Sequence, residues 1–198
     1  MYSSTIDSLQ HASFPILIPG APATRPHRMD PEAPARFAMT DFRSSPMMTV
    51  EFDASIDAAL KTMRLSGIPY AFVLGLDGRL DGLVSADDIQ GEKPMQYMVS
   101  VGCTETTCAW RDVTVENIME PVDRWQVIDF VHVTRMSAAV VAALMSRAHR
   151  RYMVVVEQAA DPRSRQVRGI FAAARLQALL GEDHDRGHAA SSVPRRLS

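Results

Sequence analysis

The chain has little that would indicate secretion, a membrane or a nucleic acid. Its 198 residues include only two cysteines, too few for a disulfide framework, so nothing indicates an oxidising compartment. A formal net charge of −2 gives no general attraction to nucleic acid. The longest apolar run, Ala138 to Met145, is far shorter than the ~20 residues of a membrane-spanning helix. No basic start precedes an apolar stretch, as in a secretory signal, and we expect a cytoplasmic protein.

Proline is concentrated near the N-terminus, where six of the 12 prolines lie before residue 36. This density disfavours helices and central strands, so residues 1–36 are predicted to form an extended or disordered arm. Residues 183–198 are polar and lack an apolar period, and we expect a disordered tail there. The folded part is therefore predicted to span residues 37–182.

An internal repeat divides this folded part into two similar halves. A shift of 82 residues brings Ser55 onto Ser137, at the start of two apolar-periodic segments that are each followed by an apolar strand. Further along, a shift of 87 residues brings Gly82 onto Gly169. The second shift is longer because residues 159–166 hold a polar insertion, which a hairpin loop can absorb.

Each half is predicted to follow the order strand, helix, strand, strand, helix. The first half has expected strands at 48–52, 70–74 and 80–84, a helix from Ser55 (or Asp53) to about Gly67, and a second helix starting at 85–88. The second half has an expected helix at 137–148, strands at 152–157 and 167–171, and a last helix at 173–180. One such unit buries too little surface to be stable alone. We therefore expect an α+β fold of two β-α-β-β-α repeats, packed sheet to sheet with pseudo-two-fold symmetry.

The strongest local motif is residues 82–89, Gly-Leu-Val-Ser-Ala-Asp-Asp-Ile. Supporting segments are the helix from Ser55, the turn Asp77-Gly78, and residues 115–119 and 167–171. In this order they resemble the tandem CBS domain pair, or Bateman module, over residues 38–181, and especially small stand-alone bacterial proteins of that type. The resemblance places the first CBS motif at 37–92, a connecting segment at 93–112 and the second motif at 113–182.

This resemblance implies a regulatory, ligand-sensing module rather than an enzyme. Such modules bind AMP, ADP, ATP or S-adenosylmethionine in the cleft between the two motifs and commonly pair as homodimers. The regulated protein partner is not indicated by the sequence. No nucleophile–base pair, glycine-rich phosphate loop or carboxylate pair stands out, so the residues themselves do not indicate an enzyme either.

Ser85 and Asp88 are the leading candidates for ligand contacts. A carboxylate can accept from both ribose hydroxyls, and the first turn of a helix offers free N–H groups to phosphate. The same Ser-x-x-Asp pattern also describes an ordinary helix-capping box, which is the alternative interpretation. Gly82 either allows a close backbone approach or only eases a bend in the strand.

The second half departs from this motif. Ala172 and Arg175 stand at the positions equivalent to Ser85 and Asp88, and a guanidinium has no acceptor for ribose hydroxyls. We therefore predict at most one nucleoside site, with the second cleft empty or blocked by Arg175.

Arg150 and Arg151 precede the second strand of the second half, where basic residues of nucleotide-binding relatives reach phosphates. Guanidinium groups suit phosphate geometry, but a solvated basic helix end is an equally good interpretation. The first half has Ile68 and Pro69 at the equivalent place, with no cation.

The resemblance places the adenine base near the first strand, among backbone groups and apolar walls. The residues concerned are Thr49, Val50, Tyr70, Leu83 and Val84. Each is also explained as plain core, apart from Tyr70, whose hydroxyl needs a hydrogen-bond partner.

Two other functions remain open. The degenerate second motif and the Pro-rich arm favour a ligand-free structural or protein-interaction module. A nucleic-acid binder that uses the arginine clusters is less favoured, because the charge is near neutral and aromatic residues are not interleaved. No metal site is expected, and Cys103 and Cys108 are predicted to be free thiols.

Overall fold

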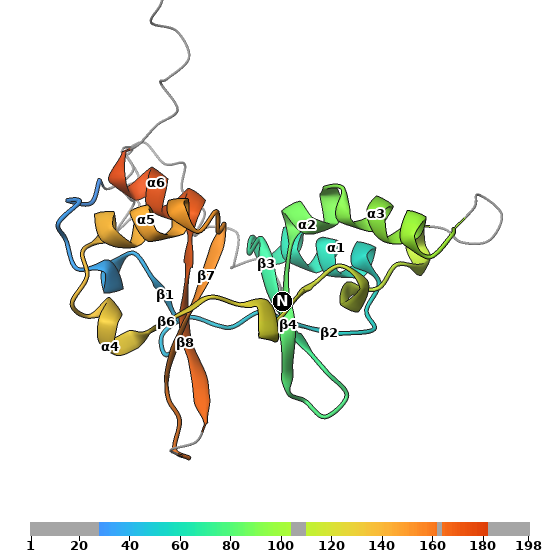
Figure 1. The fold of residues 1–198 in the computed structure, drawn as a ribbon, viewed down its shortest axis with the longest axis horizontal. Helices are drawn as coiled ribbons and strands as arrows, with labels where there is room; N and C mark the ends of the chain where they lie inside the picture. The colour runs from blue at the N-terminus through green and yellow to red at the C-terminus, as the bar shows by residue number, and fades with distance from the viewer. Residues whose placement is uncertain (1–27, 104–109, 162–163, 182–198) are drawn as a thin grey trace, which may run out of the picture.

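The computed structural model describes residues 28–103, 110–161 and 164–181. These residues form two halves that lie side by side, each a four-stranded sheet with helices against it (Figure 1). This confirms the predicted mixed α+β architecture with two sheets. Most of the predicted arm, residues 1–27, and the predicted tail, residues 183–198, lie outside the described residues. No helix in the described ranges is long and apolar enough to cross a membrane.

The first half contains the sheet β2-β3-β4-β5, in which β2 is parallel to β3 and the other neighbours are antiparallel. Its strands are β2 (Thr49–Glu51), β3 (Tyr70–Leu74), β4 (Leu80–Ser85) and β5 (Glu120–Pro121). Its helices are α1 (Ile56–Ser66), α2 (Ala86–Gln90) and α3 (Lys93–Ser100), followed by the short 3₁₀ helices η3 (Trp110–Asp112) and η4 (Val115–Asn117).

The second half contains the sheet β1-β8-β7-β6, with the same mixture of parallel and antiparallel neighbours. Its strands are β1 (Thr40–Asp41), β6 (Val127–Asp129), β7 (Tyr152–Gln158) and β8 (Arg165–Ala172). Its helices are α4 (Phe130–Val133), α5 (Ala138–Arg147) and α6 (Ala173–Leu180), with the 3₁₀ helix η2 (Ala35–Phe37). The 3₁₀ helix η5 (Val122–Arg124) follows β5 and contacts β4 of the first half.

The ends of α1 follow from local chemistry. The Ser55 hydroxyl caps the helix by accepting from the backbone N–H of Ala58 at 3.3 Å. Gly67 ends it in the left-handed conformation, with φ of 69°. His149 takes the equivalent place after α5 with φ of 50°, a conformation that a non-glycine residue rarely adopts. This turn directs the chain from α5 into Arg150 and Arg151.

Each sheet is completed by a two-residue strand whose next strand along the chain belongs to the other half. β1 pairs with β8, and β5 pairs with β4, so each added strand crosses from one half to the other. Residues 28–36 therefore differ from the extended or disordered arm expected there. Pro34 bridges to Ser137, and Ala35 is fully buried in the second half. Residues 113–121, which the sequence assigned to the second motif, pack on the first half.

The pairing of β5 with β4 and the pairing of β1 with β8 are related by the internal repeat, because the equivalent glycines Gly82 and Gly169 lie against these two added strands. A Cβ on Gly82 would lie 2.7 Å from the Glu120 carbonyl oxygen, and one on Gly169 would lie 2.6 Å from that of Thr40. Both glycines allow the neighbouring strand to approach closely. Of the two roles proposed for Gly82, the structure supports close approach, toward β5.

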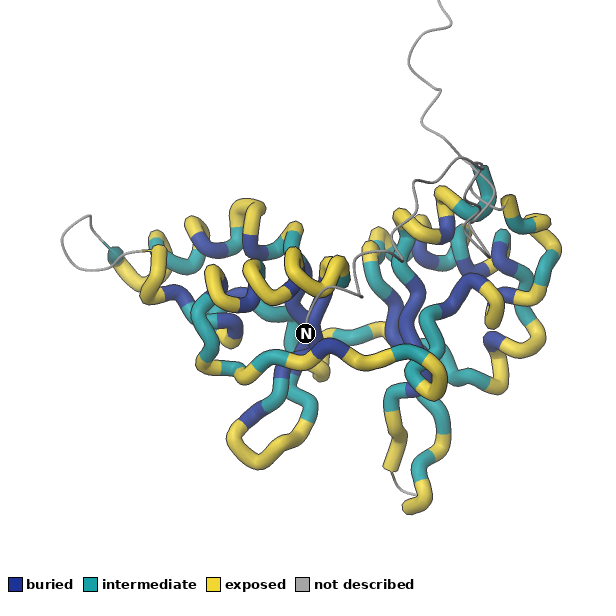
Figure 2. The backbone as a smooth tube through the Cα atoms, turned by 180° about the vertical axis from the view of Figure 1, so that it is seen from behind, coloured by how far each residue is buried: buried dark blue, intermediate teal, exposed yellow. Residues whose placement is uncertain are grey.

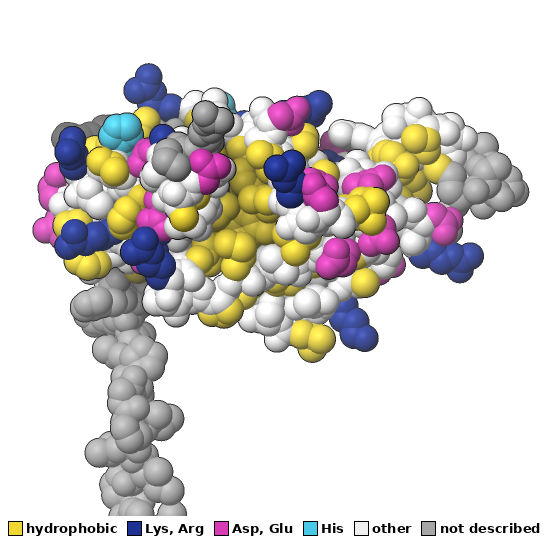
Figure 3. Space-filling view, turned by 90° about the horizontal axis from the view of Figure 1, so that it is seen from below, with side chains coloured by type: hydrophobic (Ala, Val, Ile, Leu, Met, Phe, Trp, Pro, Cys, Tyr) yellow, Lys and Arg dark blue, Asp and Glu magenta, His cyan; other side chains and the backbone are white. Residues whose placement is uncertain are grey.

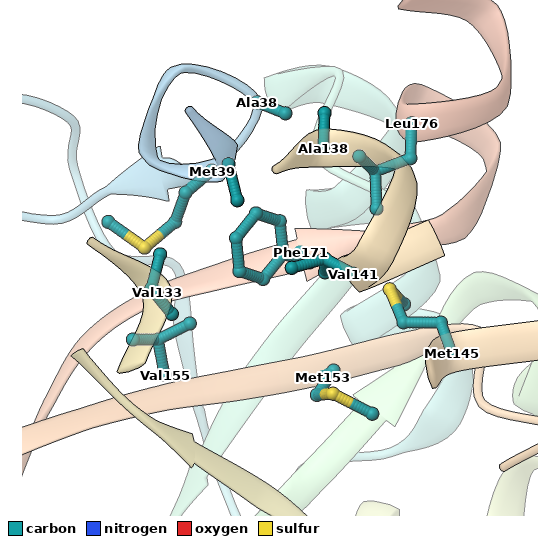
Figure 4. Close-up of a cluster of buried hydrophobic side chains, with 11 residues drawn as sticks. Ala38, Met39, Val133, Ala138, Val141, Met145, Met153, Val155, Phe171 and Leu176 are labelled. Atoms are coloured by element: carbon teal, nitrogen blue, oxygen red, sulfur yellow. The ribbon is translucent and has the colours of Figure 1, made fainter. Parts of the chain in front are cut away.

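Three clusters of buried side chains hold these layers together. Two lie between a sheet and its helices, and Figure 2 shows buried residues along the strands and on the helix faces turned to them. In the second half, Phe171 lies at the centre of one cluster, beside Met39 and Val141 (Figure 4). The third cluster, around Tyr70 and Phe72, joins the two sheets. Hydrophobic side chains also gather on the underside between the halves (Figure 3).

Cys103 is disulfide-bonded in the structure, so the prediction of a free thiol is wrong at this position. Among the described residues there is no cluster of His, Cys, Asp and Glu side chains that could hold a metal ion.

Candidate functional site

A cleft of about 670 Å³ lies between the two halves. Its walls come from the end of β4, from α2 and α3, from residues 117–121, and from residues 149–152 of the second half. The cleft brings together five of the sequence-predicted site residues, namely Leu83, Ser85, Asp88, Arg150 and Arg151. Residues 83, 85 and 88 come from the first half and the two arginines from the second, so both halves contribute to the site.

Ser85 and Asp88 form a reciprocal capping box at the start of α2. The Asp88 Oδ2 atom accepts from the Ser85 backbone N–H at 3.0 Å and from the Ser85 hydroxyl at 2.7 Å. The Ser85 Oγ atom accepts in turn from the Asp88 backbone N–H at 3.2 Å. The structure thus confirms the capping interpretation of this motif, and it leaves the Asp88 carboxylate facing the cleft.

The other oxygen of Asp88 contacts two cations. Lys93 Nζ, at the start of α3, lies 3.0 Å from Asp88 Oδ1 and also donates to the Ile118 carbonyl at 3.1 Å. Arg151 Nη2, from the second half, donates to the same Oδ1 at 3.3 Å. Arg151 Nη1 pairs with Asp87 Oδ2 at 2.9 Å, so this arginine joins the two halves.

Arg150 makes a second connection between the halves. Its guanidinium forms an ion pair with Glu120 on β5 and donates to the Arg124 carbonyl at 3.0 Å. Both arginines predicted to reach phosphates therefore have carboxylate partners in the present structure. Neither forms a merely solvated helix end.

The lining of the cleft has an excess of positive charge. Its cations are Lys93, Arg124, Arg150 and Arg151, and its carboxylates are Asp88 and Glu120. Four cations therefore face two carboxylates among the described residues. Such a surface favours an anionic ligand.

The equivalent place in the second half has Ala172 and the cation Arg175 where the first half has Ser85 and the carboxylate Asp88. Arg175 donates through Nη1 to the Thr40 hydroxyl at 3.1 Å, and the Tyr70 phenol also hydrogen-bonds to Thr40. Ala172 and Arg175 do not line this cleft. Arg175 thus occupies this place together with Thr40 and Tyr70.

The equivalent residues Tyr70 and Tyr152 have neighbours of opposite charge, Arg175 beside Tyr70 and Asp87 beside Tyr152. Tyr70 and Tyr152 lie in contact, with ring centroids 5.2 Å apart. Burial and then the carboxylate of Asp87 raise the pKa of Tyr152 to about 12. Burial also raises the pKa of Tyr70, but the hydrogen bond with Thr40 and the charge of Arg175 oppose this.

Five predicted site residues do not line the cleft. Thr49 and Val50 lie on β2, at the opposite edge of the sheet from β5. Val84 is fully buried in the core between sheet and helices, and Gly82 packs against β5. Tyr70 lies in the core between the sheets and faces Thr40.

Sequence reasoning missed several residues that line the cleft. They include Lys93, Gln96, Tyr97, Glu120 and Arg124. Lys93 lies five residues after Asp88 and is one of only two lysines in the chain. Its closeness to the Ser85–Asp88 motif could have indicated that it lies at the same site. Glu120 had no such signal, because its position depends on the crossing of β5 to the first sheet.

The comparisons with known proteins agree with this architecture. The family model of the CBS domain matches residues 39–92. No curated protein matches the sequence. An uncharacterized conserved protein from Pyrococcus horikoshii is 19% identical with a TM-score of 0.50, and the match covers 86% of this chain and 98% of that one. At this identity the likeness concerns the fold.

Two further structures are similar and were solved with nucleotides. CBSX2 from Arabidopsis thaliana in complex with AMP is 18% identical, with a TM-score of 0.46 and coverage of 73% of this chain and 93% of that one. The CBS domain of a bacterial CNNM/CorC family Mg²⁺ transporter in complex with ATP is 18% identical, with a TM-score of 0.47 and coverage of 76% and 89%.

Proposed function

We propose that the protein is a regulatory module that binds one adenosine ligand in the cleft between its halves, on the premise that residues 39–92 match the family model of the CBS domain. The ligands considered are AMP, ADP, ATP and S-adenosylmethionine. The observation that carries the proposal is the convergence of Asp88 from one half and Arg151 from the other on a single cleft. Its volume of about 670 Å³ is within the range of small-molecule sites.

The chemistry of the lining supports a nucleotide. Asp88 supplies carboxylate oxygens for ribose hydroxyls, and the excess of cations suits phosphate groups. Leu83, Ile118 and Tyr152 offer apolar surface for a base. No catalytic role is proposed for any of these residues.

One ligand per chain is proposed rather than two. In the second half a methyl group and a guanidinium replace the hydroxyl and carboxylate of the motif, and Arg175 is bonded to Thr40. An arginine offers no acceptor to ribose hydroxyls.

Regulation would act through the arrangement of the halves. A ligand in this cleft touches both halves, so it stabilises one relative placement if it binds that placement more tightly than another. A regulated protein partner, or the second chain of a homodimer, would sense the difference. Light scattering of the full chain tests the proposed homodimer, which a monomeric mass would contradict.

A ligand-free interaction module is the alternative that one observation favours. Asp88 is already hydrogen-bonded to protein groups on both oxygens, so the site is complete without a ligand. In that case Arg150 and Arg151 would serve only to join the halves.

Isothermal titration calorimetry of the full chain decides between these functions. AMP, ADP, ATP and S-adenosylmethionine are each titrated up to millimolar concentration, and at least one should bind with a stoichiometry of one per chain. Asp88→Ala should then weaken binding more than tenfold, because the ribose loses its acceptor. Asp77→Ala is the matched control, since Asp77 pairs with Arg79 on a distant hairpin. Failure of all four ligands to bind would exclude the nucleotide-sensing function.

A further inference from the structure

Protein groups already contact both oxygens of the Asp88 carboxylate. A carboxylate offers about four lone-pair positions on its two oxygens. Three hydrogen bonds reach them, from the Ser85 backbone N–H and hydroxyl on Oδ2 and from Arg151 on Oδ1, and the Lys93 ammonium forms an ion pair with Oδ1. The side chain of Asp88 is only 13% exposed, which leaves little room for a further partner. A ribose can therefore bind this carboxylate only after protein donors leave it.

The fold decides which donors can leave. The Ser85 donors are held by the capping box at the start of α2, and Ser85 is 1% exposed. Lys93 and Arg151 are long side chains with 41% and 59% of their surface exposed, and they reach Asp88 from α3 and from the second half. Because exposed ion pairs of this kind contribute little stability, these two cations are the groups that a ligand can displace.

The displaced cations then need another anion. The only other carboxylate that lines the cleft among the described residues is Glu120, and it is already paired with Arg150. A neutral nucleoside would take Asp88 and leave Lys93 with only the Ile118 carbonyl and Arg151 with only the exposed Asp87, beside a positively charged cleft. A phosphorylated nucleoside brings its own acceptors, to which guanidinium and ammonium groups bind strongly.

We infer that this site requires a phosphate on its ligand, and that Lys93 and Arg151 transfer from Asp88 to that phosphate when a nucleotide binds. The inference rests on the proposed function and narrows its ligand class. AMP, ADP and ATP meet the requirement, whereas adenosine and S-adenosylmethionine, whose sulfonium adds a further positive charge, do not. The transfer also releases a direct bond between the halves, because Arg151 and Asp88 belong to different halves.

Calorimetry with AMP, adenosine and S-adenosylmethionine on the full chain tests the requirement. Wild-type protein should bind AMP at least tenfold more tightly than adenosine or S-adenosylmethionine. In Lys93→Ala/Arg151→Ala the acceptors of Asp88 become free, so AMP should weaken at least tenfold while adenosine binds more tightly than to wild type. A change of opposite sign for the two ligands separates this exchange from simple damage to the site.

Matched controls keep the test informative. Arg79→Ala removes an exposed arginine that pairs with Asp77 outside the cleft, and it should leave both affinities unchanged. Thermal unfolding checks that each variant is folded. Equal binding of AMP and adenosine to wild type, or tighter binding of S-adenosylmethionine, would overturn the inference and leave the proposed function standing. Absence of binding by every adenosine ligand would overturn both.

Discussion

The first half ends β4 with Ser85 and presents Asp88 on the next helix, whereas the second half has Ala172 and Arg175 at the equivalent places. The reverse holds just before β3 and β7, where the first half has the uncharged Pro69 and the second half has Arg151. Each half thus carries one charged element that the other lacks. In the cleft these elements meet as Asp88 and Arg151, so the two halves are complementary there rather than alike.

Packing positions behave differently from these charged positions. Gly82 and Gly169 both lie against a strand that crosses from the other half, and Met119 and Met39 contact them in the same way. A close backbone approach tolerates no side chain at either glycine. The repeat therefore keeps residues that its backbone arrangement requires and varies those that face the cleft.

The largest expected difference between the halves concerns their cores. Phe171 and Val84 occupy equivalent places, each fully buried between a sheet and its helices. Phe171→Ala should lower the free energy of unfolding by about 3–5 kcal/mol. Val84→Ala removes two carbons and should cost about 2 kcal/mol. Urea denaturation of both variants measures the difference, and equal losses would contradict it.

The two glycines should respond alike. In Gly82→Ala and in Gly169→Ala the new Cβ meets a backbone carbonyl oxygen that cannot move away freely. Each substitution should therefore destabilise the protein by about 1–3 kcal/mol. Gly78→Ala is the control for backbone strain without a steric clash. A Cβ there meets no atom within 4 Å, but the backbone is left-handed, with φ of 71°. Denaturant midpoints that shift for only one of the two buried glycines would break the predicted symmetry.

A smaller difference is expected at the helix starts. The Ser55 hydroxyl caps α1, whereas the equivalent Ser137 hydroxyl makes no cap and is buried without a hydrogen-bond partner among the described residues. Ser55→Ala should cost about 1 kcal/mol. Ser137→Ala should cost less, because it removes a polar group that is not satisfied. Thermal unfolding of both variants ranks them, and the opposite order would show that Ser137 has a role of its own.

The smallest effect appears only at high pH and concerns the paired tyrosines. Since burial raises the pKa of Tyr152 from 10.0 to about 12, the folded state is fully stabilised below pH 10 and loses stability as the pH rises toward 12. Tyrosinate absorbance should show Tyr70 titrating before Tyr152, because Arg175 faces Tyr70 and Asp87 faces Tyr152. Tyr70→Phe and Tyr152→Phe assign the two steps. If Tyr152→Phe removed the earlier step, the charge difference between the halves would be wrongly assigned.

Much of the fold was accessible from the sequence because helices and inner strands have strong periods. The shift that relates Ser55 to Ser137 identified both long helices, and the Ser85–Asp88 pattern correctly located the start of α2. The crossing of β1 and β5 could not be read in this way. Each has two residues, too few to show any period, and their partners lie far away in the sequence.

The candidate site was only partly accessible for the same reason. Asp88 was expected to contact a ligand from the Ser-x-x-Asp pattern and Arg151 from the resemblance to nucleotide-binding relatives, and the structure places both at the cleft. Thr49 and Val50 do not line the cleft, and the sequence could not show this because a strand pattern does not reveal which edge of a sheet the strand occupies. The bonds of Lys93 and Arg151 to Asp88 depend on α3 and on the placement of the halves, neither of which a local pattern encodes.

The crossing strands also make the two halves unequal in how the chain assembles them. All four strands of the first sheet lie within residues 49–121, one continuous stretch of chain. The second sheet takes β1 from one end of the described chain and β8 from the other, as the pairing of Thr40 with Ile170 shows. In topological terms the first half is an insertion within the second. During synthesis the first sheet has every strand available once residue 121 has been added, but the second must wait until β8 is complete.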